Sequence, residues 1–202
     1  MFKQLWKYVK SVHHLEDLPD ADRPEFAFVG RSNVGKSSLL NALTNQKNLA
    51  KTSSTPGRTQ ALNFFEPSGY KENLYLVDLP GYGFAKAPKK LVEKWQELLK
   101  HYLRGRPSLH RVFLLIDSRH GLKKVDNEIL DMLDDAGVTY QIVLTKIDKV
   151  KKTFLEKICA EIKEKLIKHP AAFPEILMTS SEKNIGIDTI KNTIEEMQKY
   201  LT

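Results

Sequence analysis

The chain has 202 residues and a net charge of +7 with histidine counted as neutral, because 32 Lys and Arg face 25 Asp and Glu. This length suits one domain, or one domain with a small addition, and it can bury a core without disulfides. A composition of 41% hydrophobic and 28% charged residues excludes wholesale disorder. The basic excess indicates either a polyanionic partner or simply a solvated basic surface.

The sequence predicts neither a membrane span nor a disulfide framework. No apolar stretch approaches the roughly 20 residues of a spanning helix, and no apolar segment follows the charged N-terminus as a secretory signal requires. The single cysteine, Cys159, falls beside an apolar helical stripe and fits a reducing compartment. We therefore expect a cytoplasmic protein, and we also expect it to be a monomer.

Short apolar runs alternate with segments of helical periodicity along the chain. The six runs predicted as strands are 26–29, 62–65, 74–77, 112–116, 141–144 and 176–178. The segments predicted as helices are 36–43, 91–103, 126–135, 153–168 and 188–201. This alternation predicts right-handed βαβ units, and hence an α/β fold with a mostly parallel six-stranded sheet and helices on both faces.

Two parts of the chain depart from this alternation. Residues 66–70, Glu-Pro-Ser-Gly-Tyr, are too short for a crossover helix, so the second and third runs should form an antiparallel hairpin. That hairpin leaves one antiparallel strand at the sheet edge. Residues 1–23 are locally acidic and lack a clear period, so they add a short helix, a short strand or no regular structure. We therefore divide the chain into an N-terminal extension, 1–23, and a domain, 24–202.

The first predicted strand runs directly into a glycine-rich loop. Residues 30–37, Gly-Arg-Ser-Asn-Val-Gly-Lys-Ser, match G-x-x-x-x-G-K-S between a strand and a helix. The glycines allow a tight turn whose N–H groups point at an anion, at the positive end of the helix dipole. Lys36 would reach the β- and γ-phosphates and Ser37 would ligate Mg²⁺. The alternative is a glycine turn with an incidental lysine, which the flanking strand and helix disfavour.

A second segment follows the third predicted strand. Residues 78–81, Asp-Leu-Pro-Gly, match D-x-x-G, in which the Asp78 carboxylate holds Mg²⁺ through a water and the Gly81 N–H meets the γ-phosphate. Taken alone this is a common turn sequence. Its position after a strand of the same predicted sheet makes it part of a phosphate site, because ligands bind at the carboxyl ends of parallel strands.

Two further segments bear on which base is bound. Residues 145–148, Thr-Lys-Ile-Asp, follow the fifth run, and Asp148 can accept two hydrogen bonds from guanine where adenine offers no donor. The Lys146 stem would pack along the base and the phosphate loop. Residues 179–181, Thr-Ser-Ser, follow the sixth run, and their backbone could meet the guanine O6. That last signal is weak, because such clusters commonly make turns or helix caps.

The order of these segments resembles the translation-factor-type P-loop GTPases, with their Ras-like fold, over residues 24 to 201. It is closer still to the bacterial EngB (YihA, YsxC) family of the TrmE–Era–EngA–YihA–septin-like GTPases. The segments that carry the resemblance are 30–38, 51–60, 78–85 and 117–120. The resemblance implies a GTP-hydrolysing switch in assembly of the large (50S) ribosomal subunit, with a role in cell division and septation.

Residues 52–60, Thr-Ser-Ser-Thr-Pro-Gly-Arg-Thr-Gln, are polar and turn-rich. The resemblance makes them the first switch, which orders with GTP and loosens after hydrolysis. It assigns Thr59 to Mg²⁺ and the γ-phosphate. The metal ligands expected are Ser37, Thr59 and, through water, Asp78. The nucleotide-binding residues expected are Gly30, Arg31, Ser32, Asn33, Val34, Gly35, Lys36, Ser37, Gly57, Arg58, Thr59, Gln60, Ala61, Asp78, Leu79, Pro80, Gly81, Thr145, Lys146, Ile147, Asp148, Thr179, Ser180 and Ser181.

The residue after the D-x-x-G segment is Tyr82, where many signalling GTPases have a water-orienting glutamine. We therefore expect slow, Mg²⁺-dependent intrinsic hydrolysis. Asn33 resembles the asparagine that helps to hold K⁺ in related potassium-dependent GTPases, and the alternative is an asparagine tolerated in a tight turn. The residues expected to take part in catalysis are Lys36, Thr59, Gly81 and Asn33.

The positive charge is concentrated in residues 86–111. Eight basic residues stand against Glu93 and Glu97, a net +6; they are Lys86, Lys89, Lys90, Lys94, Lys100, Arg104, Arg106 and Arg111. We expect this segment to contact ribosomal RNA and proteins of the large subunit or its precursor. The alternative is the wet face of a helix whose Trp95 and Tyr102 are buried. Two other functions stay open: a P-loop ATPase or small-molecule kinase, and an RNA-binding protein with a dormant nucleotide site.

Overall fold

The computed structural model describes residues 1–51, 61–69, 74–83 and 89–200, with the backbone alone for residues 89–92 and 95. The strands are β1 (Trp6–Val12), β2 (Glu25–Gly30), β3 (Leu62–Pro67), β4 (Tyr75–Asp78), β5 (Leu109–Asp117), β6 (Tyr140–Thr145) and β7 (Leu177–Met178). The helices are α1 (Lys36–Leu43), α2 (Lys89–Gly105), α3 (Lys124–Asp135), α4 (Lys152–Leu166) and α5 (Ile187–Lys199), with 3₁₀ turns at Leu15–Asp17 and Ile147–Lys149. None of these described helices is long and apolar enough to cross a membrane.

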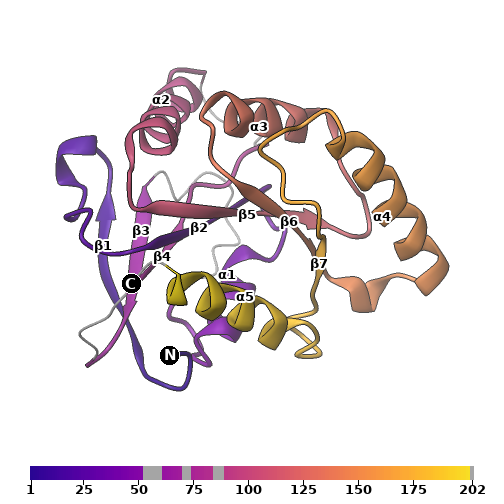
Figure 1. The fold of residues 1–202 in the computed structure, drawn as a ribbon, viewed down its shortest axis with the longest axis horizontal. Helices are drawn as coiled ribbons and strands as arrows, with labels where there is room; N and C mark the ends of the chain where they lie inside the picture. Colours follow the sequence, from indigo (N-terminus) through magenta and orange to yellow (C-terminus); the bar gives the residue numbers. More distant parts are fainter. Residues whose placement is uncertain (52–60, 70–73, 84–88, 201–202) are drawn as a thin grey trace.

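One mixed sheet organises the molecule, with the strand order β1-β3-β4-β2-β5-β6-β7 (Figure 1). Strands β4, β2, β5, β6 and β7 are mutually parallel, and β3 runs antiparallel to β4. The predicted α/β class, the hairpin and the helices on both faces are confirmed. One hydrophobic cluster packs α2, α3 and α4 on one face, and a second packs α1 and α5 on the other.

The sheet has a seventh strand that the sequence pattern did not reveal. Strand β1, from the segment before residue 24, pairs antiparallel with β3 and takes the edge, so β3 lies one place inside it. The register shifts between Tyr8 and Lys10, which breaks the alternation that marks a half-buried strand. Trp6 and Val12 are nonetheless buried. The division of the chain at residue 24 remains a prediction, and residues before it complete the same sheet.

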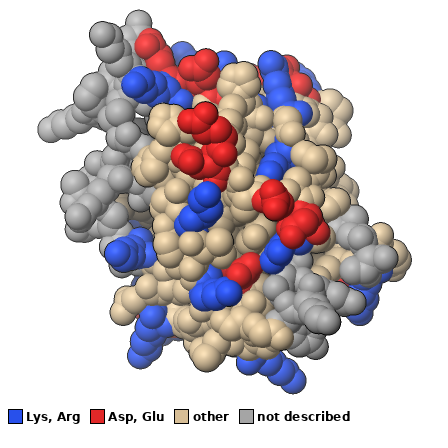
Figure 2. All heavy atoms as spheres, turned by 90° about the vertical axis from the view of Figure 1, so that its left-hand side faces the viewer, with Lys and Arg blue, Asp and Glu red and all other residues tan. Residues whose placement is uncertain are grey.

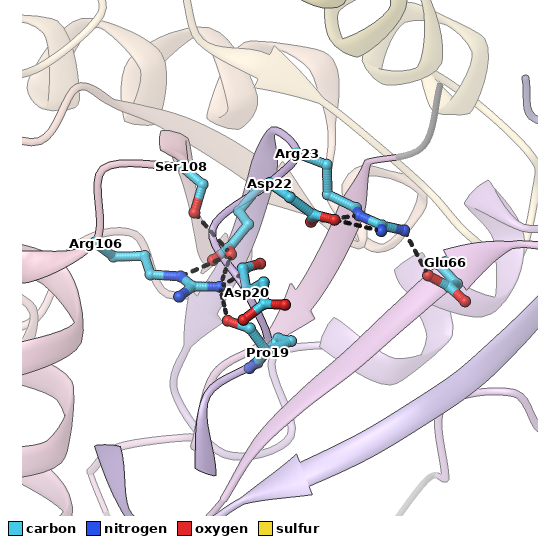
Figure 3. A network of polar contacts seen from close by, with 8 residues as sticks. Pro19, Asp20, Asp22, Arg23, Glu66, Arg106 and Ser108 are labelled. Atoms are coloured by element: carbon cyan, nitrogen blue, oxygen red, sulfur yellow. Dashed lines mark hydrogen bonds and ion pairs between the residues drawn. The ribbon is translucent and has the colours of Figure 1, made fainter. Parts of the chain in front are cut away.

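The amino ends of β2 and β5 are tied to α2 by a buried carboxylate, Glu25. It accepts hydrogen bonds from Tyr102 Oη at 2.7 Å, Arg106 Nε at 2.7 Å and Ser108 Oγ at 2.9 Å. Arg106 also donates to the Pro19 carbonyl at 2.7 Å, which fastens the preceding segment (Figure 3). A buried charge needs such partners, and this set fixes the C-terminal end of α2 at the sheet edge opposite the glycine-rich loop.

Candidate functional site

The glycine-rich loop lies at the carboxyl end of β2 and turns into α1. A Cβ on Gly30 would lie 2.8 Å from Val34 Cγ1 and 3.0 Å from the Leu115 carbonyl oxygen, so only glycine fits there. Asn33 and Gly35 both have positive φ, 61° and 106°, which favours those two residue types. The two glycines of the sequence motif, Gly30 and Gly35, are therefore required by this backbone path.

Lys36, the first residue of α1, pairs its ammonium with the carboxylate of Asp78 at the end of β4. Strands β2 and β4 are parallel neighbours, which brings the two predicted phosphate segments to one edge of the sheet. Ser37 Oγ is 3.3 Å from the Lys51 carbonyl oxygen. The described residues hold no group of three or more His, Cys, Asp or Glu side chains that could bind a metal ion by itself. A hydroxyl, a carboxylate and phosphate oxygens suit Mg²⁺, which keeps several waters and seldom uses an all-protein cage.

The segment that follows Asp78 is bound to the loop through its backbone. The Tyr82 N–H donates to the Gly30 carbonyl at 3.3 Å, and the Ser32 N–H donates to the Tyr82 carbonyl at 3.1 Å. The Leu79 N–H donates to the Phe28 carbonyl at 2.9 Å. The predicted residues of the loop and of the D-x-x-G segment therefore form one continuous surface.

Tyr82 does not face this surface. Its side chain is 1% exposed, and Tyr82 Oη donates to Asp126 Oδ1 of α3 at 2.7 Å. Burial, with the neighbouring Asp126 charge, raises the pKa of Tyr82 well above its usual value. The phenol is thus a neutral core group, and it is not placed to orient water as a glutamine at that position would.

Lys146 lies across the glycine-rich loop. Lys146 Nζ is 2.6 Å from the Asn33 carbonyl oxygen and 3.0 Å from Asp117 Oδ2, and Thr145 Oγ1 donates to the Val34 carbonyl at 2.7 Å. The Lys146 side chain thus contacts the loop, and its packing along a base stays a prediction. Asp117, at the end of β5, is the member that residue-level reasoning missed. Its position at the carboxyl end of a predicted buried strand could have marked it as a site residue.

Asp148 lies in the 3₁₀ turn after β6, beside the loop that follows β7. The Ile147 N–H donates to the Thr179 carbonyl at 3.2 Å, which joins the two predicted base-binding segments. A hydrogen bond from Ser180 lowers the pKa of Asp148, so the carboxylate is ionised near neutral pH. Asp148 Oδ2 also forms an ion pair with Lys149, whose Nζ lies 3.2 Å away. An ionised carboxylate is an acceptor that suits a ligand offering N–H donors.

Some predicted site residues cannot be placed. Gly57, Arg58, Thr59 and Gln60 lie outside the described residues, whereas Ala61 is described and buried. The first switch therefore stays a prediction.

Fewer basic side chains of the segment 86–111 are exposed than its net charge implies. Arg106 is used internally by Glu25, and the Arg111 guanidinium lies 4.4 Å from the centre of the Phe173 ring, where burial lowers its pKa. The exposed cations described in α2 are Lys94, Lys100 and Arg104. Lys86 and the side chains of Lys89 and Lys90 lie outside the described part. Tyr102 is buried, as the alternative interpretation predicts.

Comparison with known proteins agrees with this geometry. A family model described as "50S ribosome-binding GTPase" matches residues 25–146, and one for the elongation factor Tu GTP-binding domain matches residues 97–199. The GTP-binding protein EngB of Roseobacter denitrificans is 59% identical over 191 residues, covering 95% of this chain and 87% of that protein. The EngB of Bartonella quintana is 54% identical over 200 residues, covering 96% and 93%.

Solved structures show the same fold. A GTP-binding protein engB has a TM-score of 0.67 at 23% identity, covering 87% of this chain and 99% of that one. Era in complex with MgGDPNP and nucleotides of 16S ribosomal RNA has a TM-score of 0.69 at 28% identity, covering 88% of this chain and 56% of that one. Since one family model spans more than half of the chain and close relatives span nearly all of it, the chain belongs to the EngB family of GTP-binding proteins, which are P-loop GTPases.

Proposed function

We propose that this protein is a GTP-dependent switch that binds the large (50S) ribosomal subunit or its precursor during assembly. It would act in the cytoplasm as a monomer and share the role in cell division and septation that family resemblance implies. The observation that carries the nucleotide part is the meeting of three segments at one sheet edge. Lys36 pairs with Asp78, and Lys146 crosses the loop that precedes Lys36.

In this proposal the backbone of residues 30–37 surrounds the phosphates, and Lys36 exchanges Asp78 for the β- and γ-phosphates. Ser37, Thr59 and, through water, Asp78 would hold Mg²⁺, whose charge offsets that of the phosphates when it is bound. The Gly81 N–H would meet the γ-phosphate. Asp148 would accept from the guanine N1–H and 2-amino group, with residues 179–181 near O6. Adenine offers no donor at that edge, so ATP would leave the carboxylate unpaired.

Hydrolysis would be slow, because Tyr82 is turned into the core and supplies no group to the attacking water. A K⁺ ion held by Asn33 would supply positive charge at the transition state. The positive φ of Asn33 gives a separate reason for asparagine there, so the K⁺ role needs its own test.

The ribosomal part is supported by the family description and by the charge of α2. Exposed Lys94, Lys100 and Arg104 would meet RNA phosphates. Era, a neighbour in fold, is solved with ribosomal RNA. On the face at the β1 edge, the basic and acidic residues that the structure describes are interspersed (Figure 2).

Co-sedimentation with purified large-subunit particles tests the proposal, in GDP, a non-hydrolysable GTP analogue and no nucleotide. We expect association that depends on the nucleotide and weakens with salt. Equal association in all three states would contradict a switch. Competition between GTP and ATP separates the ATPase or kinase alternative, and absence of GTP turnover, with or without particles, would leave the dormant-site alternative.

A further inference from the structure

Three residues far apart in sequence meet behind the phosphate site. Asp126 Oδ1 accepts from Tyr82 Oη at 2.7 Å and lies 3.3 Å from Arg31 Nε. Asp126 Oδ2 accepts from the Lys123 N–H at 2.6 Å, which also caps α3. Arg31 Nη2 donates to the Gly121 carbonyl at 3.0 Å. Asp126 is fully buried, so its charge depends on these partners.

Arg31 is therefore not a phosphate ligand through its side chain. Its guanidinium points from the loop toward α3, and its backbone stays in the loop. Arg31 and Tyr82 are also linked by an isolated β-bridge. One residue of the glycine-rich loop and one residue after D-x-x-G are thus joined twice, once through the backbone and once through a common buried carboxylate.

The double connection between Arg31 and Tyr82 lies next to the proposed γ-phosphate contact. Tyr82 immediately follows Gly81, whose N–H is the group proposed to meet the γ-phosphate. Gly83 comes next with φ of 80°, so the chain turns away directly after the anchored residue. Fixing Tyr82 relative to the loop restricts where Gly81, the preceding residue, can place its N–H. A contact between the Gly81 N–H and the γ-phosphate would strengthen binding of GTP but not of GDP, because GDP has no γ-phosphate.

We propose that Tyr82 and Asp126 are positioning residues that set the affinity for GTP relative to that for GDP. Tyr82 Oη, bound to Asp126, holds the Gly81 N–H at the distance from the loop that a γ-phosphate requires. This inference rests on the proposed function. Tyr82 thereby contributes by position at the site where other GTPases use a glutamine to orient water.

The variant Tyr82→Phe removes one hydroxyl and leaves Asp126 paired with Arg31 and the Lys123 N–H. We expect the affinity for a GTP analogue to fall about 3- to 10-fold, the size of one lost buried hydrogen bond, with GDP affinity unchanged. Asp126→Asn keeps an acceptor for the hydroxyl and removes the charge that faces Arg31. We expect it to move the affinity ratio in the same direction by less, which provides a second measurement if Tyr82→Phe folds poorly.

Tyr102→Phe is a matched control, because Tyr102 Oη also donates to a buried carboxylate, Glu25 Oε2, at 2.7 Å. It lies at the opposite sheet edge. Dissociation constants for GDP and a non-hydrolysable GTP analogue, with thermal melts, should be measured for each protein. We expect both Tyr→Phe variants to lose a similar amount of stability. Only Tyr82→Phe should lower the affinity for the GTP analogue relative to that for GDP.

An equal loss of affinity for both nucleotides in Tyr82→Phe would overturn the inference, as would an equal change of the ratio in Tyr102→Phe. A wild-type protein that binds neither guanine nucleotide would overturn the proposed function and this inference together. A wild-type protein that binds both, with an unchanged ratio in the two site variants, would overturn this inference alone.

Discussion

Lys36 and Asp78 form an ion pair between the start of α1 and the end of β4. Each would have to exchange the other for a nucleotide group, Lys36 for phosphate oxygens and Asp78 for a Mg²⁺-bound water. The pair keeps two nearly buried charges neutralised until the ligand arrives.

Replacing the cation should show this exchange. In Lys36→Ala we expect GDP and GTP affinity to fall at least tenfold, because one hydrogen bond between charged groups is lost. Fluorescent-nucleotide titration with and without Mg²⁺ measures it. Lys191→Ala, at a cation on α5, is the control and should bind as the wild type does. Unchanged affinity in Lys36→Ala would exclude the loop as the phosphate site.

Base specificity should follow the Asp148 carboxylate. Asp148→Asn turns part of the acceptor into a donor, which suits a base with an oxygen in place of the 2-amino group. We expect GTP affinity to fall by roughly a hundredfold and xanthosine triphosphate to become the better ligand. Asp188→Asn, at an exposed α5 carboxylate, serves as the control. A retained preference for GTP in Asp148→Asn would place the guanine elsewhere.

The contribution of the Asp117 carboxylate, which pairs with Lys146 beside the glycine-rich loop, to the free energy of unfolding should depend on pH. Burial opposes ionisation of Asp117, but hydrogen bonds from Arg119 and Lys146 outweigh it and hold the pKa of Asp117 well below its usual value. A lowered folded-state pKa means that the ionised group stabilises the fold above about pH 4, and that this is lost as pH falls further. Urea unfolding of wild type and Asp117→Asn should therefore differ most near pH 7 and converge below pH ~4. A difference that does not vary with pH would contradict this.

Potassium should matter only if Asn33 holds it. We expect GTP turnover to be faster in KCl than in NaCl, and Asn33→Gly, which keeps the positive φ, to lose the difference. Equal wild-type turnover in the two salts would remove K⁺ from the mechanism and leave Asn33 as a residue of the turn.

Two arginines close together in sequence should behave differently. Arg106→Met leaves buried Glu25 without its cation, and we expect about 3–5 kcal/mol less free energy of unfolding. Arg104→Met breaks only an exposed 3.9 Å pair with Asp135, and should cost about 1 kcal/mol or less. Denaturant melts check both.

Arg104→Glu with Lys100→Glu should weaken ribosome binding and its salt dependence without changing GDP affinity.

The order of the phosphate, Mg²⁺ and base segments was predictable because each is short and contiguous. Gly30 is required by the close approach of its neighbours and Gly35 by its positive φ. Asp78 ends the buried strand β4, and Asp148 lies in the turn just after the buried strand β6. Such constraints act on the residues themselves. The parallel strands then follow from the alternation of apolar runs with helical segments.

Contacts between distant segments were not predictable in this way. No local period in the sequence links Tyr82 to Asp126, Lys146 to Asp117 or Arg106 to Glu25. The net charge of residues 86–111 includes arginines that are partly buried in the folded chain. The irregular register of β1 hid an edge strand from the sequence pattern. The chemistry of the loop and the α/β class could be read from local sequence. Which charges face water and which are buried depends on partners that folding brings together, so it became visible only in the folded molecule.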